Sequence, residues 1–170
     1  MKTIIFLFAL LFIGVTAYTR LASQTTGILP GCAPDAGAAA QSAPPSDQTL
    51  IEDAIKRFMR GGDESDTILL AGVLHPQFRV VVNQGVLGME SLRVIDRPAY
   101  FQQIAGKKWG GVPRTVNIVS VSIANTVAAA EVKTSSVRSD ITSFLHLVKG
   151  KDGNWTLIGD TPFPTPKKGH

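Results

Sequence analysis

The chain has 170 residues with 17 basic and 13 acidic side chains, which give a formal net charge of +4. The basic residues are spread along the sequence, and the longest clusters are only the pairs Lys107-Lys108 and Lys167-Lys168. Nucleic-acid binding requires a basic stripe with interleaved aromatic side chains, so this distribution argues against a nucleic-acid partner. The single cysteine, Cys32, excludes an intramolecular disulfide.

The first 17 residues have the features of a secretory signal peptide. Lys2 supplies the positive charge, Thr3–Val15 is the apolar core, and Val15–Ala17 provides the small residues before a cleavage site. We therefore predict export, to the periplasm or outside the cell, with cleavage after Ala17. The alternative is an uncleaved membrane anchor, but the apolar run is shorter than the ~20 residues of a spanning helix. We expect no stable membrane insertion after cleavage.

Residues 18–46 consist mainly of Ala, Gly, Pro, Ser, Thr and Gln. Such a segment cannot bury enough apolar surface to offset its ordering entropy, so a disordered linker is predicted. Leu29–Cys32 is similar to a bacterial lipobox, but its distance from the apolar run argues against lipidation of Cys32. A single domain over residues 47–165 and a short tail over residues 166–170 follow.

Two helices are predicted at the start of this domain. Ser46 or Asp47 can cap the first, whose apolar residues recur at helical spacing until Gly61-Gly62, where we expect the helix to end. Asp63 is expected to cap the second. His75-Pro76 is expected to end it, because the residue before proline avoids the helical region.

A β-hairpin and a third helix come next. Residues 78–82 and a segment ending at Ile95 are predicted strands, joined through a turn at Asn83–Gly85. Asp96 has the features of an N-cap, and Pro98 is tolerated in the first turn of a helix that reaches about Ala105.

The C-terminal third of the chain predicts an antiparallel sheet, and the fold class is therefore α+β. Asp152-Gly153 lies between two alternating runs, which is a strong hairpin signal. The alternation slips between Ile118 and Val119, which indicates a β-bulge and a curved sheet. The predicted strands cover residues 115–124, 127–136, 141–149 and 155–159.

The expected hairpin also assigns the two sides of the last two strands. If the Asp152-Gly153 turn has two residues, one side is apolar apart from His146, and we predict that this side faces the helices. The opposite side is interrupted by Lys149, Thr156 and Asp160. The predicted helix-facing set is Phe144, His146, Val148, Trp155 and Leu157, and the other set is Leu145, Leu147, Lys149, Thr156, Ile158 and Asp160.

The order of these elements and four short motifs resemble the nuclear-transport-factor-2-like superfamily, in particular its putative lumazine-binding branch. The motifs are Gly61–Asp63, Leu74–Phe78, Leu145–Lys149 and Gly153–Trp155. The resemblance implies a cone of three N-terminal helices packed on a strongly curved antiparallel sheet, often with a pocket between them. Relatives include ketosteroid isomerases, SnoaL-like cyclases and non-catalytic binding or dimerisation modules, so the fold alone does not define the function.

Few ionisable residues remain for chemistry. Asp47, Asp63, Asp96 and Asp152 are explained as caps or turn residues, and no cluster has the spacing of a metal site. We predict no metal, no cofactor and no catalytic residue. The alternative is an isomerase, dehydratase or hydrolase with His146 as acid or base, since the pKa of histidine lies near neutrality.

The leading hypothesis is an exported, non-catalytic module that binds a small apolar or aromatic molecule, or a protein partner, in the cone. A homodimer through the outer face of the sheet is a third possibility. The candidate ligand-binding residues are aromatic side chains together with His146, although aromatic residues at such positions more often fill the core. They are Phe58, Phe78, Tyr100, Trp109, Phe144, His146 and Trp155.

Overall fold

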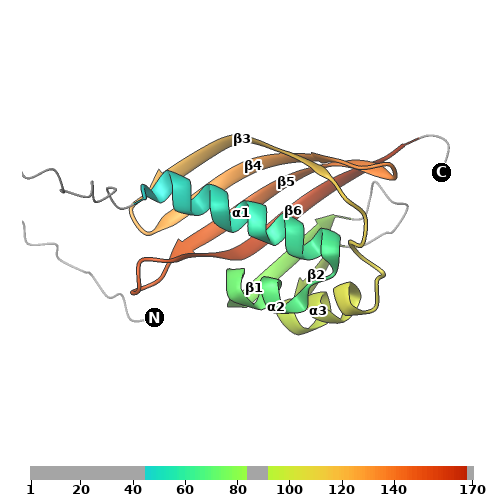
Figure 1. Ribbon diagram of the computed structural model, residues 1–170, viewed down its shortest axis with the longest axis horizontal. Helices are drawn as coiled ribbons and strands as arrows, with labels where there is room; N and C mark the ends of the chain where they lie inside the picture. The colour runs from blue at the N-terminus through green and yellow to red at the C-terminus, as the bar shows by residue number, and fades with distance from the viewer. Residues whose placement is uncertain (1–44, 84–91, 168–170) are drawn as a thin grey trace, which may run out of the picture. The chain divides into compact units, whose positions relative to one another are not determined.

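The computed structural model describes residues 45–83 and 92–167. The predicted signal peptide, nearly all of the predicted linker with Cys32, most of the turn after Asn83, and residues 168–170 lie outside the described residues. Among the described residues there are three helices and six strands (Figure 1). They are α1 (Asp47–Glu64), α2 (Thr67–Val73), β1 (Leu74–Asn83), β2 (Leu92–Asp96), α3 (Arg97–Ala105), β3 (Thr115–Ala124), β4 (Val127–Ser135), β5 (Ser139–Lys149) and β6 (Trp155–Pro166).

The six strands form one sheet in the order β2-β1-β6-β5-β4-β3. All neighbouring pairs are antiparallel except β1 and β6, which run parallel. Helix α1 lies along one face of the sheet, while α2 and α3 lie near the β1–β2 hairpin (Figure 1). The α+β class and the mostly antiparallel sheet are therefore as predicted. None of the helices within the described ranges combines the length and the hydropathy that a membrane crossing requires.

Helix α1 is longer than predicted. It continues through Gly61-Gly62, both buried, and ends at Glu64; the C-cap residue Ser65 adopts the left-handed conformation with φ 56°. Asp63 lies inside α1 and does not cap the next helix. That position belongs to Asp66, whose Oδ1 accepts hydrogen bonds from the backbone N–H groups of Ile68 and Leu69 at 2.9 Å. The predicted stop was wrong because Gly61 is needed for packing: a Cβ there would lie 2.8 Å from Cγ of Leu70.

The hairpin and the third helix follow the prediction more closely. Strand β1 already begins at Leu74, so His75 and Pro76 belong to the strand and not to the end of α2. Asp96 caps α3 as predicted, since its Oδ1 accepts a hydrogen bond of 2.9 Å from the backbone N–H of Ala99. The predicted bulge in β3 is also present, between Ile118 and Ser120.

The predicted sides of β5 are wrong. Leu145 and Leu147 are buried under the helices, whereas Phe144 is 52% exposed on the outer face together with His146. The cause is the loop after β5: Lys149 pairs with Trp155, so residues 150–154 form a five-residue loop in place of a two-residue turn. A shift of one residue moves every side chain of a strand to the opposite face. Trp155 and Leu157 keep their predicted place on the inner face. A register shift in β6, between Leu157 and Gly159, then turns Asp160 inward as well, contrary to prediction.

Candidate functional site

The parallel pair β1–β6 separates before either strand ends. Their last paired residues are Val80 and Asp160, and beyond this point the strands are no longer bonded to each other. The next inward-facing residues of the two strands, Val82 and Pro162, both line a cavity of about 400 Å³. Proline is tolerated here because β6 has become an edge strand, where its missing N–H leaves no ladder bond unmade. The cavity therefore lies at a fork in the sheet.

Aromatic side chains form one wall of the cavity. Tyr100 on α3 and Trp109 in the following loop both line it, with ring centroids 6.0 Å apart in a T-shaped arrangement. Behind them, the Phe78 ring lies 5.3 Å from Tyr100 and 5.9 Å from Phe58. Phe78 and Phe58 are buried in the core. Of this aromatic chain, only Tyr100 and Trp109 border the cavity.

The loop between α3 and β3 is fixed against the end of α1. Gly110 adopts φ +70°, and a Cβ at this position would collide with the carbonyl oxygen of Gly62. The backbone N–H of Gly111 donates to the same oxygen at 3.0 Å. This close approach, which only glycine allows, holds Trp109 beside Tyr100.

Arg114 joins this loop to α1 through an ion pair. Its Nε donates to Oδ1 of Asp63 at 2.5 Å, and its backbone N–H donates to Oδ2 at 3.1 Å. Its Nη2 donates to the carbonyl oxygen of Met59 at 3.1 Å. Arg114 also lines the cavity, so a paired guanidinium forms part of the wall. Asp63, expected to cap a helix, instead positions this arginine.

Three buried polar residues lie on the inner face of the sheet, next to strand positions that line the cavity: Asp160, Ser143 and Thr134, exposed by 8%, 4% and 4%. Asp160 is one inward-facing position before the lining residue Pro162, and Ser143 pairs with Pro162. Neither Oδ1 of Asp160 nor Oγ1 of Thr134 has a hydrogen-bond partner among the described residues. Unpaired buried polar atoms are rare and call for a ligand, a water molecule or a functional role.

Asp160 is electrostatically unusual. Burial raises its pKa to about 7, although the Ser143 hydroxyl and the charge of Arg114 act in the opposite direction. Burial likewise raises the pKa of the Tyr100 phenol above its usual range, and the nearby Asp160 adds to this effect. Near neutral pH the cavity therefore adjoins a carboxyl group that can be either protonated or ionised, and a neutral phenol.

The candidate residues predicted from the sequence are not brought together. Tyr100 and Trp109 line the cavity, whereas Phe58 and Phe78 are core residues behind it. Phe144 and His146 lie on the outer face, contrary to prediction, and His146 borders a separate depression of about 400 Å³ between β3, β4, β5 and β6.

Trp155 is buried near the start of α1, where its Nε1 donates to Oδ1 of Asp47 at 3.0 Å. It does not line the cavity. Asp160, Arg93 and Arg114 were missed as site residues. Pro162 and Pro164 were the available signal, because prolines in a continuing strand mark an edge. No group of three metal-ligating side chains occurs among the residues that the structure describes.

Comparison with known proteins identifies the family. Residues 46–161 match the model of the family described as "Putative lumazine-binding", so the chain belongs to that family. Solved structures show the same nuclear-transport-factor-2-like fold. No curated protein matches the sequence.

Three of these structures illustrate the range. A nuclear-transport-factor-2-like protein of unknown function from Shewanella baltica is 19% identical with a TM-score of 0.61. The match covers 69% of this chain and 93% of the Shewanella chain. One from Methylobacillus flagellatus is 16% identical with a TM-score of 0.60, and the match covers 73% of this chain and 96% of the Methylobacillus chain. A ketosteroid isomerase-like protein from Erwinia carotovora is 11% identical with a TM-score of 0.55, and the match covers 68% of this chain and 93% of the Erwinia chain. At these identities the similarity shows the fold alone.

Proposed function

We propose that this protein is an exported module that binds a small aromatic molecule in the cavity at the fork of the sheet. One observation carries the proposal: a cavity of about 400 Å³ with an aromatic wall lies close to Asp160, whose buried Oδ1 has no hydrogen-bond partner among the described residues. Ligand sites are commonly concave and mostly apolar, with volumes of roughly 300–1,000 Å³ and a few convergent polar groups. The carboxyl group of Asp160 would orient a ligand held by Tyr100 and Trp109.

Binding can be tested with the neutral fluorescent probe N-phenylnaphthylamine. We expect saturable fluorescence enhancement that is lost in Val82→Phe, because Val82 points into the cavity and a larger side chain would fill it. Val81→Phe is the matched control, since the neighbouring residue of β1 points to the other face. Equal binding by both variants would place the probe elsewhere and contradict the proposal.

An acid–base enzyme is the second candidate, and Asp160 favours it. A carboxyl group with a pKa of about 7 beside an apolar cavity can accept or donate a proton near neutral pH. The simplest reaction for such a group is proton exchange at a carbon next to a carbonyl. Deuterium exchange into the aromatic ketone tetralone should be accelerated by the protein and not by Asp160→Asn. Equal exchange rates in the two proteins would exclude this role.

Export from the cell is part of the proposal and rests on the charged start and apolar run of residues 1–17. N-terminal sequencing of secreted or periplasmic material should begin near Tyr18. Recovery of Met1 on membrane-bound protein would contradict cleavage and favour an anchor.

Self-association through the outer face of the sheet is a compatible property. Phe144 and Phe163 are diagonal neighbours on this face and are 52% and 50% exposed. Exposed apolar side chains that lie together often mark interfaces. Sedimentation equilibrium should then detect a dimer that Phe144→Glu dissociates, and an unchanged monomer would contradict it.

A further inference from the structure

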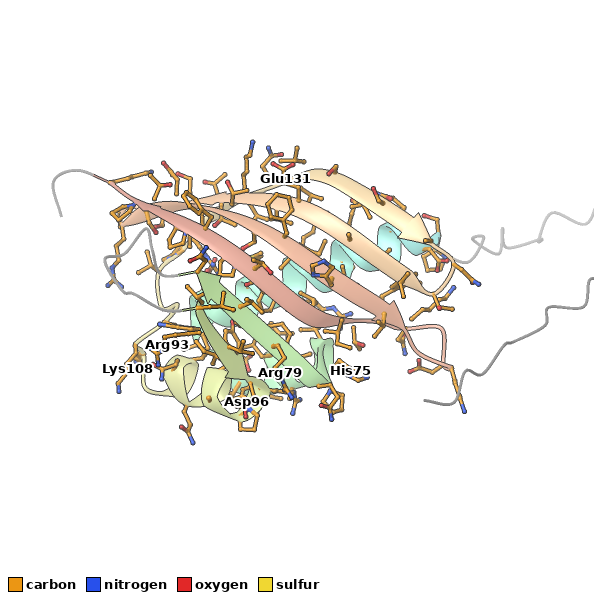
Figure 2. The ribbon with its side chains drawn as sticks, turned by 180° about the vertical axis from the view of Figure 1, so that it is seen from behind. His75, Arg79, Arg93, Asp96, Lys108 and Glu131 are labelled. Carbon is orange, nitrogen blue, oxygen red and sulfur yellow. The ribbon has the colours of Figure 1, made fainter. Side chains whose placement is uncertain are left out.

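The cavity lining includes a positive charge for which the described residues provide no ion-pair partner. Arg93 on β2 pairs across the hairpin with Val82, and the two residues line the cavity together. Cross-strand partners point to the same face of a sheet, so Arg93 is directed inward although it lies on an edge strand. Figure 2 labels Arg93 near one end of the hairpin, and Arg79 and Asp96 toward the other.

No acidic residue among those described neutralises this charge. None of the ion pairs formed within the described ranges includes Arg93. The other guanidinium of the cavity wall, Arg114, is already bound by Asp63. Asp96 and Arg79 are cross-strand neighbours on the outward side of the same hairpin. Asp96 is therefore directed away from Arg93.

Apart from Arg93 and the paired Arg114, the cavity lining is uncharged. Tyr100 and Trp109 present a hydroxyl and an indole to the cavity, and the lining includes no carboxylate. A guanidinium offers five N–H donors in a planar fork that matches carboxylate and sulfonate groups. An apolar cavity with such a group on its wall favours a ligand that combines an aromatic body with an anionic substituent.

We propose that Arg93 makes the cavity selective for small planar aromatic anions, with the aromatic body against Tyr100 and Trp109 and the anionic group on the guanidinium of Arg93. This inference rests on the proposed function, because it specifies the class of molecule that the same cavity binds. An inward charge on an edge strand also discourages edge-to-edge pairing of sheets, but that role requires no ligand. The two roles therefore differ in what a ligand titration detects.

The test uses two dyes that differ by one anionic group, N-phenylnaphthylamine and anilinonaphthalene sulfonate. Wild-type protein should bind the sulfonate dye more tightly, and Arg93→Gln should weaken that dye about tenfold, as expected for one charge-assisted hydrogen bond. The neutral dye should change less than about twofold, a difference that falls within ordinary context effects. Arg93→Lys should keep part of the preference, because it retains the charge and loses the fork.

Arg79→Gln is the matched control, since it removes the same charge from the outward side of the hairpin and should change neither affinity. Equal effects of Arg93→Gln on both dyes, or no effect on either, would overturn the inference while leaving cavity binding intact. A preference of the wild type for the neutral dye would overturn it as well. Failure of both dyes to bind wild-type protein would instead overturn the proposed function, and the inference with it.

Discussion

The two ends of the inner sheet face share strand β6 and have opposite properties. At one end, Trp155 and Leu157 of β6 are buried, and Trp155 contacts the start of α1. At the other end, beyond the register shift in β6, Pro162 and Pro164 are the inward residues of the same strand and line a cavity. The difference arises at Asp160, where β1 stops pairing with β6. A continued sheet gives a filled core, and a forked sheet gives a cavity.

The acidic residues at the two ends differ in the same way. At the filled end, the hydrogen bond from Lys149 holds the pKa of Asp47 below its usual value, and the Trp155 indole adds to this effect. At the fork, burial raises the pKa of Asp160 to about 7. One carboxyl group is paired and ionised, and the other is buried without a partner for Oδ1. The filled end therefore contributes mainly to stability, whereas the fork contains a carboxyl group that can gain or lose a proton near neutral pH.

The largest expected effect is that of Trp155→Ala at the filled end. Truncating a buried aromatic side chain leaves a void, and the free energy of unfolding should fall by about 3–5 kcal/mol. Urea denaturation measures this loss. Phe163→Ala on the same strand is the control, because Phe163 is 50% exposed and should cost less than about 1 kcal/mol. Similar losses for both variants would contradict the assigned faces of β6.

At the fork, Asp160 should make stability fall as the pH rises. Between pH 3.8 and about 7 the folded state holds a proton that the unfolded state has released. The free energy of unfolding should therefore decrease across this window by up to about 4 kcal/mol and level off above it. Asp160→Asn should remove most of this dependence.

Denaturant unfolding at a series of pH values measures the effect. Asp140→Asn is the control, because hydrogen bonds from Ser135 and then Lys167 lower the pKa of Asp140, which therefore affects stability only at more acidic pH. A wild-type stability that stays constant or rises from pH 4 to pH 7 would contradict the burial that raises the pKa of Asp160.

Features of these two ends could be predicted from the sequence where they depend on a few neighbouring residues, and not where they depend on distant ones. The cap at Asp96 and the bulge after Ile118 were predicted because each is encoded within a few neighbouring residues. The side of β5 was not, because it depends on the length of the loop at Gly150–Asn154, and the Asp-Gly pair suggested a shorter turn. Helical patterning likewise gave no hint that Gly61 is packed against α2.

The candidate site was even less accessible to sequence reasoning. Asp160 becomes a candidate site residue only because the pairing of β1 with β6 ends there. The last pair, Val80 and Asp160, joins residues that are 80 positions apart in the sequence. In the sequence, nothing distinguishes Arg93 from other charged residues of short edge strands. Only its pairing with Val82 shows that it belongs to the cavity side of the hairpin. Tyr100 and Trp109 were among the predicted ligand-binding residues, and each combines an apolar body with a polar group.

A smaller effect concerns the loop that closes the cavity. Gly110→Ala should lower the free energy of unfolding by more than about 2 kcal/mol, since the new Cβ collides with the Gly62 carbonyl and a positive φ is also unfavourable. Gly153→Ala has a comparable φ of +82° but open space around its Cβ, so it should cost about 1–2 kcal/mol. Thermal unfolding of the two variants separates the collision from the strain. Equal losses would mean that the loop does not rest on α1.

The smallest expected effect is that of His146→Leu, which tests the outer face. His146 is exposed there and pairs across the sheet with Ala129 and Gly159. Neither the cavity nor the buried core includes it, so the free energy of unfolding should change by less than about 0.5 kcal/mol. Binding of N-phenylnaphthylamine should remain unchanged. If the variant loses more than about 1 kcal/mol, His146 holds a buried partner and the sheet faces the other way. If stability is kept but dye binding falls, the dye occupies the depression beside His146, and the outer face is the binding surface.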